Sequence, residues 1–224
     1  MKKTALVIGS TGLVGRLLVL NLLEDNCFEK IISFSRRSLD INHSKLREYL
    51  IDFEEVNKWK EWVRGDVLFS ALGTTIKQAG SKAAQYKVDF TYQYEVARIA
   101  AENQVSRYVL VSSLGADPTS RIFYSRMKGE LDEAVRKLGF EKISIVRPSA
   151  LKGEREKERK SERIVIAVTG SVIKILPFLK KYQPIDAGIV ARAMINISMD
   201  ESEEKYRIFN NDVLFKLAGN SIND

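Results

Sequence analysis

Three side chains in the middle of the chain have the types and spacing of a proton-transfer site. Tyr124 and Lys128 are four residues apart in a segment of helical periodicity, so they share one face of the expected helix. Ser113 comes 11 residues before Tyr124 and follows an apolar run that indicates a strand. A phenol ordinarily has a pKa of about 10, and a nearby ammonium favours the phenolate. These three residues are therefore candidate catalytic groups; Ser112 is a rival for Ser113, and an ordinary core tyrosine is the alternative.

A glycine-rich turn near the start of the chain is the clearest binding motif. It lies between an apolar, β-branched run at 4–8 and a run of helical apolar spacing at 13–23. Glycines at its first, fourth and seventh positions permit a tight turn, close approach to a pyrophosphate, and close packing of helix on strand. The helix start offers free N–H groups to phosphates. The predicted cofactor contacts are Gly9, Ser10, Thr11, Gly12, Leu13, Val14 and Gly15.

Two arginines follow the second expected strand, at the position that faces the adenosine ribose in dinucleotide-binding folds. Sites for NAD carry an Asp or Glu there, whereas this chain has Arg36 and Arg37. A guanidinium makes charge-assisted hydrogen bonds to a 2′-phosphate that a carboxylate would repel. We therefore predict NADP(H) as the cofactor, in preference to NAD(H). The alternative is a pair of surface arginines at a strand end.

The end of the third expected strand carries a further candidate for cofactor binding. Asp52 could accept the adenine amino group, with Phe53 beside the ring. Asp52 could equally cap the next helix, because Glu54 and Glu55 follow it. Both interpretations stand on the sequence alone.

The elements that must position these residues alternate between strands and helices. Strands are expected at 4–8, 31–35, 46–51, 66–72, 107–112, 142–147 and 206–209, and helices at 13–23, 54–63, 85–103, 123–138, 164–179, 186–199 and 211–217. This alternation predicts an α/β fold, a three-layer α/β/α Rossmann fold with a doubly wound parallel sheet in strand order 3-2-1-4-5-6-7. We expect one domain over 1–224, with a cofactor core at about 1–150 and a small substrate region at 151–224.

Composition narrows the classes of protein that remain. The chain is 45% hydrophobic and 29% charged, as soluble globular proteins are, and its net charge of +7 suits an anionic cofactor or substrate. The single cysteine, Cys27, excludes an internal disulfide and favours a cytoplasmic location, and the isolated His43 offers little to a metal. The chain starts directly with a strand, which leaves no room for a signal peptide. The longest apolar stretch, 164–179, is too short for a membrane span, and no basic stripe points to nucleic acid.

A densely charged segment at 153–163 precedes that apolar stretch. It is either a solvated loop or a flap over the substrate. In the second case we expect it to be mobile without ligand and ordered with substrate.

Taken in order, these motifs resemble the short-chain dehydrogenase/reductase superfamily, in the atypical, extended form that shares features with nucleotide-sugar epimerases. The resembling segments are 8–15, 72–75, 87–89, 112–117, 124–130 and 147–149. Within the superfamily the chain is most similar to the Tat-interacting oxidoreductase homologues and their bacterial relatives.

The resemblance implies roles for the candidate residues. NADP(H) would bind at the glycine turn and at Arg36 and Arg37. Tyr124 would be the acid/base, Lys128 would hold the nicotinamide ribose and favour the phenolate, and Ser113 would orient a carbonyl or hydroxyl. Further cofactor contacts would come from Ala71, Leu72, Gly73, Thr74, Pro148 and Ser149.

The chain departs from the family pattern in two places. An Asn of the long helix joins the proton relay in many relatives, whereas Asp89 is nearest that place here. The C-terminal region is also shorter than the substrate domain of epimerase-type members, which argues against a large nucleotide-sugar substrate.

The leading prediction is an NADP(H)-dependent oxidoreductase that acts on a small carbonyl or alcohol. The alternatives are a nucleotide-sugar epimerase or dehydratase, and a non-catalytic NADP(H) sensor that regulates a protein partner. A homo-oligomer is compatible with each.

Overall fold

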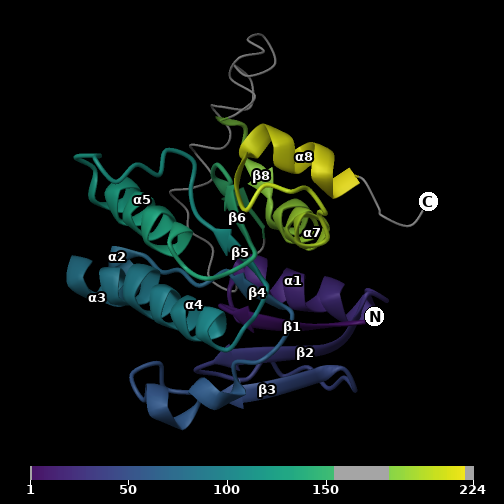
Figure 1. Ribbon diagram of the computed structural model, residues 1–224. Helices are drawn as coiled ribbons and strands as arrows, with labels where there is room; N and C mark the ends of the chain where they lie inside the picture. Colours follow the sequence, from purple (N-terminus) through teal and green to yellow (C-terminus); the bar gives the residue numbers. More distant parts are fainter. Residues whose placement is uncertain (1, 154–181, 220–224) are drawn as a thin grey trace.

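The computed structural model describes residues 2–153 and 182–219 (Figure 1). The helix expected at 164–179, and the charged segment at 153–163 beyond Gly153, lie outside these residues.

A parallel sheet of seven strands forms the centre of the described structure. The strands are β1 (Lys3–Ile8), β2 (Phe28–Ser35), β3 (Leu46–Leu50), β4 (Val67–Ser70), β5 (Arg107–Val111), β6 (Lys142–Arg147) and β9 (Tyr206–Asn210). Their order is β3-β2-β1-β4-β5-β6-β9, and every neighbouring pair is parallel. The predicted fold class and strand order are confirmed. The strand order reverses between β1 and β4, and ligands of such sheets bind at the carboxyl ends of the strands at this point.

Helices cover both faces of the sheet (Figure 1). One face carries α1 (Leu13–Glu24), α7 (Ala187–Ser198) and α8 (Asn211–Gly219), and the other carries α4 (Gln93–Glu102) and α5 (Phe123–Arg136). Alternate residues of β1 divide between two buried cores: Val7 packs in the core on the α1 side, and Ile8 in the core on the α4 side. This period of two is what a sheet buried on both faces requires.

The segment after β3 differs from the helix expected at 54–63. It forms two short 3₁₀ turns, Val56–Lys58 and Lys60–Trp62. Trp59 between them is buried, and its indole N–H donates to the backbone oxygen of Asp52 at 2.8 Å. The buried Trp59 side chain and its hydrogen bond hold the chain in tight turns where the sequence pattern predicted a continuous helix.

The long helix expected at 85–103 is broken into several pieces. The short helices α2 (Ile76–Ala79) and α3 (Lys82–Tyr86) come first, followed by a π-helical segment (Lys87–Tyr92) and then by α4. Gly80, at φ +90°, ends α2 in the left-handed conformation. A further two-stranded ladder that we did not expect joins β7 (Leu151–Lys152) to β8 (Ile185–Asp186).

Candidate functional site

The glycine turn between β1 and α1 is built so tightly that two of its positions exclude a side chain. Gly9 has φ +79°, and a Cβ on it would lie 2.4 Å from the carbonyl carbon of Ala71. A Cβ on Gly15 would lie 2.1 Å from the Gly9 oxygen. Gly12 is less constrained, since its Cβ would lie 3.1 Å from that oxygen. The turn therefore brings bare backbone to the carboxyl end of β1, where a pyrophosphate could approach it.

The other residues of the turn offer mainly backbone. The Oγ atoms of Ser10 and Ser33 are 2.6 Å apart and buried, and Val14 is buried in the core. Thr11 is exposed, and Leu13 is half-buried. No side chain caps the N-terminus of α1, and its first turn has no acidic residue. The N-terminus of α1 is therefore suited to an anion.

Arg36 and Arg37 follow β2 directly, and both are exposed. Ser35 Oγ donates to the backbone oxygen of Arg37 at 2.6 Å, which fixes the turn that carries them. Within the part of the chain that the structure describes, neither guanidinium has a hydrogen bond or ion pair. Both are therefore available to an anionic group.

Asp52 and Phe53 are already engaged within the protein. Asp52 is exposed, and its Oδ1 accepts the backbone N–H of Glu54 at 2.9 Å, which closes a local turn. The residue that precedes the first 3₁₀ turn is Glu55, and no side chain caps that turn, so Asp52 is not the helix cap that the alternative interpretation expected. Phe53 is buried and stacks on Tyr92, with ring centroids 5.2 Å apart. A contact of either residue with adenine stays a prediction.

The segment after β4, which holds Ala71, Leu72, Gly73 and Thr74, lies against the glycine turn. The Ala71 N–H donates to the Ile8 oxygen at 3.0 Å. Thr74 is held at both of its backbone groups: its N–H donates to Asp89 Oδ2 at 2.8 Å, and its oxygen accepts from Gln85 Nε2 at 3.1 Å. The sheet thus fixes both turns at the same carboxyl edge.

The candidate catalytic residues lie on α5 and just after β5. Lys128 is buried; its Nζ is 3.4 Å from the Val111 oxygen at the end of β5 and 3.7 Å from Asp89 Oδ1. Tyr124, one turn earlier, is 40% exposed. Ser113 is half-buried and donates to the Leu114 oxygen at 3.3 Å, whereas Ser112 is buried. A partly exposed hydroxyl suits contact with a substrate, which favours Ser113 over Ser112.

Pro148 and Ser149 follow β6 at the same edge. The Pro148 oxygen accepts the Leu114 N–H at 2.9 Å, which links the ends of β5 and β6. The Ser149 N–H donates to Asn211 Oδ1 at 3.0 Å, and its hydroxyl donates to the Gln183 oxygen. The polar groups of Ser149 therefore link the end of β6 to α8 and to the segment before β8.

Two buried carboxylates lie close to Lys128. Burial raises the pKa of Asp89, and the Lys128 ammonium and the Thr74 N–H oppose that rise. Burial also raises the pKa of Asp132, which the Ser112 hydroxyl and Arg147 oppose. The Arg147 Nη2 and Asp132 Oδ2 atoms are 2.8 Å apart.

The sequence reasoning missed Asp132, Arg147 and Gly129. Tyr124, Lys128 and Asp132 recur every four residues, a spacing that could have shown a third polar group on this face of α5. A Cβ on Gly129 would lie 2.2 Å from the Pro118 nitrogen, so glycine lets the loop before α5 pack on the helix beside Lys128. A glycine inside a helix costs about 1 kcal/mol relative to alanine, which was the available signal.

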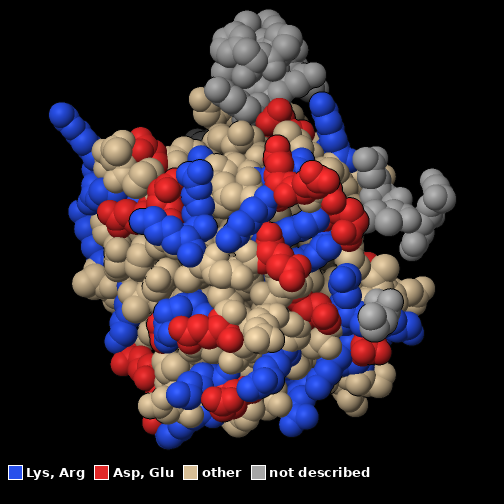
Figure 2. All heavy atoms as spheres, in the orientation of Figure 1, with Lys and Arg blue, Asp and Glu red and all other residues tan. Residues whose placement is uncertain are grey.

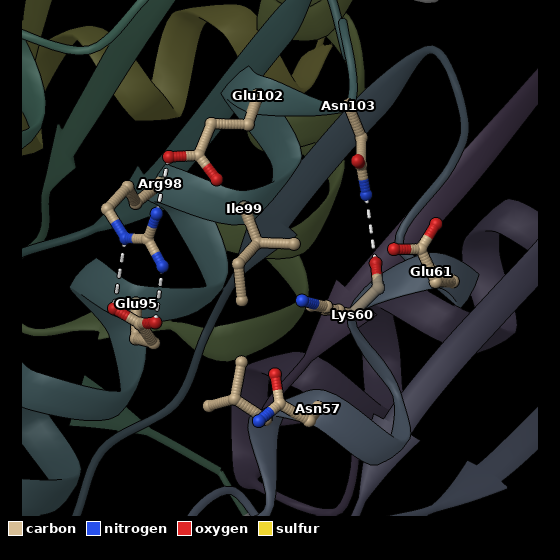
Figure 3. A pocket seen from close by; sticks show the side chains of 9 residues that line it. Asn57, Lys60, Glu61, Glu95, Arg98, Ile99, Glu102 and Asn103 are labelled. Atoms are coloured by element: carbon tan, nitrogen blue, oxygen red, sulfur yellow. Dashed lines mark hydrogen bonds and ion pairs between the residues drawn. The ribbon is translucent and has the colours of Figure 1, made fainter.

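A polar cavity of about 440 Å³ lies away from these residues, between α4 and the 3₁₀ turns (Figure 3). Arg98 in its wall pairs with Glu95 and Glu102, and the Asn103 side chain donates to the Lys60 oxygen at 2.9 Å. None of the predicted site residues lines it.

The surface of the described structure shows no concentration of one charge on the face that Figure 2 presents. Basic and acidic side chains are interspersed over the face shown in Figure 2. Among the described residues, no three His, Cys, Asp or Glu side chains are grouped to hold a metal ion. Within 2–153 and 182–219, no helix is long and apolar enough to cross a membrane.

The sheet, its reversal at β1 and the glycine turn define a Rossmann-like dinucleotide-binding fold, and solved structures share it. A UDP-glucose 4-epimerase from Thermotoga maritima superimposes with a TM-score of 0.67 at 15% identity, covering 96% of this chain and 81% of that chain. The oxidoreductase ylbE from Lactococcus lactis gives a TM-score of 0.66 at 18% identity, covering 96% and 94%. A short-chain dehydrogenase/reductase family oxidoreductase from Burkholderia thailandensis gives a TM-score of 0.68 at 16% identity, covering 96% of this chain and 94% of that chain. At these identities the likeness establishes the fold alone.

The family model described as NAD(P)H-binding matches residues 9–172, and the chain belongs to this family. Its curated relatives include "Protein fmp52, mitochondrial" of Aspergillus niger, 35% identical over 197 residues, or 85% of this chain and 84% of the relative. "Protein FMP52, mitochondrial" of Candida albicans is 34% identical over 226 residues, or 97% of this chain and 98% of the relative.

The names of these relatives contradict the cytoplasmic location that we expected. They are called mitochondrial proteins. The expectation depended mainly on the single cysteine, which does not distinguish one reducing compartment from another.

Proposed function

We propose that the chain is an NADP(H)-dependent oxidoreductase of the short-chain dehydrogenase/reductase type that acts on a small carbonyl or alcohol. The observation that carries this proposal is the buried ammonium of Lys128 at the carboxyl end of β5, one helical turn from the partly exposed Tyr124. Burying a lysine is costly, so its presence at the ligand-binding edge of the sheet calls for a function there. The neighbouring backbone cradle at Gly9 and Gly15 fits a dinucleotide.

The residues that would hold the cofactor come from successive strand ends. The glycine turn would bind the pyrophosphate, and Arg36 and Arg37 the 2′-phosphate. Ala71, Leu72, Gly73, Thr74, Pro148 and Ser149 would border the rest of the cofactor. When bound, NADP(H) supplies or accepts a hydride at the substrate carbon.

Proton transfer would be the task of Tyr124. In the direction of reduction, its hydroxyl donates a proton to the carbonyl oxygen as that oxygen gains charge, and solvent returns the proton to the phenolate. Lys128 stabilises the phenolate, and the Ser113 hydroxyl donates a hydrogen bond to the same substrate oxygen. In the direction of oxidation, the phenolate accepts the proton of the alcohol.

Two further proposals concern the domain organisation of the chain and its place within the superfamily. We propose one domain over 1–224, in which 151–224 contacts the substrate. We also propose that, within the short-chain dehydrogenase/reductase superfamily, the chain groups with the Tat-interacting oxidoreductase homologues. A transient-oxidation epimerase would use the same three residues, and the fold shared with the Thermotoga maritima enzyme favours it as the second candidate.

We expect the protein to bind NADPH more tightly than NADH. A charge-assisted hydrogen bond contributes about 1.5–3 kcal/mol, so Arg36→Ala should weaken NADPH binding by about 10- to 100-fold and change NADH binding little. Isothermal titration of both cofactors against both proteins measures this.

Arg64→Ala is the matched control for this prediction. Arg64 is also exposed, but it pairs with Glu61 away from the glycine turn, so NADPH affinity should not change. Equal affinity of the unsubstituted protein for the two cofactors would refute the preference for NADP(H), and so would unchanged NADPH binding in Arg36→Ala and Arg37→Ala.

A further inference from the structure

The short loop that carries Arg36 and Arg37 is fixed to the body of the protein, although both arginine side chains are exposed. It runs from the end of β2 to Asp40. Leu39, two residues after Arg37, is 1% exposed and packs in the core on the α1 side. Asp40 has φ +53°, a left-handed conformation that is uncommon for a residue other than glycine. The loop therefore follows a defined path from a strand end into the core.

A carboxylate from the neighbouring strand holds this loop. Glu48 lies on the edge strand β3 and is half-buried. Its Oε2 accepts the Leu39 N–H at 2.8 Å, and its Oε1 accepts from Ser38 Oγ at 3.2 Å. Ser38 Oγ in turn accepts the Asp40 N–H at 2.9 Å. One side chain thus engages two successive backbone N–H groups of the loop, the second through the serine.

The opposite side of the loop is tied to the helix that follows the glycine turn. Arg16, in the first turn of α1, donates through Nη1 to the Leu39 oxygen at 2.8 Å. Leu39 is therefore held at its N–H by Glu48, at its oxygen by Arg16, and by the burial of its own side chain. One residue thus joins the loop proposed to bind the 2′-phosphate to the helix proposed to bind the pyrophosphate.

Glu48 acts on the backbone of the loop and not on the arginine side chains. In the part of the chain that the structure describes, no ion pair joins Glu48 to Arg36 or Arg37. Both of its oxygens accept from the loop itself, whereas the acid of an NAD site accepts from the ribose. A loop that is fixed in advance binds a ligand more tightly, because a free loop must lose conformational freedom on binding.

We propose that Glu48 is a positioning residue that determines the preference for NADP(H). It holds the loop of Arg36 and Arg37 in the conformation that receives the 2′-phosphate, and it does not itself touch the cofactor. The proposal rests on the proposed function of these two arginines. Because NADH lacks the 2′-phosphate, the conformation of the loop matters for one cofactor only.

The test is titration of the protein with NADPH and, separately, with NADH, which requires no substrate. Fixing the backbone of one residue corresponds to about a tenfold change in affinity, so Glu48→Ala should weaken NADPH binding by about tenfold and change NADH binding little. Without cofactor, hydrogen exchange over residues 36–41 should be faster in this variant, because the Leu39 N–H has lost its acceptor. Thermal unfolding verifies that the variant is folded.

Two further variants separate positioning of the loop from a general structural effect. Glu48→Gln keeps an oxygen that can accept the Leu39 N–H, so most of the preference for NADPH should return. Glu95→Ala is the matched control. Glu95 is also half-buried, but it pairs with Arg98 on α4, away from the loop, so neither affinity should change.

The outcomes distinguish this proposal from the proposed function. An undiminished preference for NADPH in a folded Glu48→Ala protein overturns the proposal, and so does an equal loss of affinity for both cofactors, which marks a structural effect. A Glu48→Gln protein that behaves as Glu48→Ala also overturns it, because the retained acceptor would then have no effect. The proposed function survives these results if Arg36→Ala weakens NADPH binding. Equal affinity of the unsubstituted protein for both cofactors overturns the preference for NADP(H) and this proposal together.

Discussion

Replacing Tyr124 with phenylalanine is expected to lower carbonyl reduction by about 10²–10⁴-fold, the loss typical of a missing general acid. The substitution removes one oxygen and leaves the ring in place. Because Tyr124 is 40% exposed at the start of α5, the free energy of unfolding should change by no more than about 0.5 kcal/mol. NADPH affinity should also be retained. Initial rates of NADPH consumption with a carbonyl substrate, together with titration of NADPH, measure the two effects separately.

Tyr94→Phe is the control for this experiment. Tyr94 lies on α4, where it stacks against Phe90, and its hydroxyl plays no part in the proposed chemistry. The Tyr94→Phe protein should therefore consume NADPH at the same initial rate as the unsubstituted protein. Undiminished activity of the Tyr124→Phe protein would refute the role of Tyr124 as acid, even for an active enzyme.

Replacing Gly15 with alanine should weaken cofactor binding strongly. The new Cβ would lie 2.1 Å from the Gly9 oxygen, far inside van der Waals contact, so α1 must move away from the turn. Overpacking of this kind costs about 1–3 kcal/mol of stability. The shift would remove backbone N–H groups from the pyrophosphate, and loss of one charge-assisted hydrogen bond costs about 1.5–3 kcal/mol, so we expect NADPH affinity to fall by about 10- to 100-fold. Titration of NADPH and thermal unfolding of the same samples measure both losses.

Gly139→Ala separates this steric effect from the general effect of adding a methyl group. A Cβ on Gly139 meets no atom within 4 Å. The variant should therefore bind NADPH normally and unfold at the usual temperature. Normal binding by the Gly15→Ala protein would show that the turn is not the pyrophosphate site.

The sheet could be predicted from the sequence because its strands are short, apolar and separated by strong turn and helix signals. A run such as 4–8, buried on both faces, is nearly all apolar. The glycines after it indicate a tight turn from this strand into a helix. Right-handed crossovers then leave few strand orders, which explains the agreement across β3-β2-β1-β4-β5-β6-β9.

The details that the sequence did not reveal depend on tertiary contacts. The 3₁₀ turns after β3 follow from the anchoring of Trp59 in the core, which a local helical pattern cannot show. The π-helical segment is tied to β4 through Gln93 and Ser70, two residues far apart in the chain. The same applies to the site: the spacing of Tyr124 and Lys128 is local, but the pairing of Lys128 with Asp89 arises only when α5 packs on the π-helical segment.

The central claim, that this protein transfers hydride with the help of Tyr124, is tested most directly with NADPH that carries deuterium at the reactive carbon of the nicotinamide. Both stereoisomers of the labelled cofactor are incubated with a panel of small aldehydes and ketones, and the alcohols formed are analysed by mass spectrometry. We predict that one stereoisomer delivers deuterium to the carbinol carbon of at least one substrate, and that Tyr124→Phe slows this transfer by about 10²–10⁴-fold while it still binds NADPH. Tight NADPH binding with no deuterium transfer across a broad panel would contradict the claim and indicate a sensor.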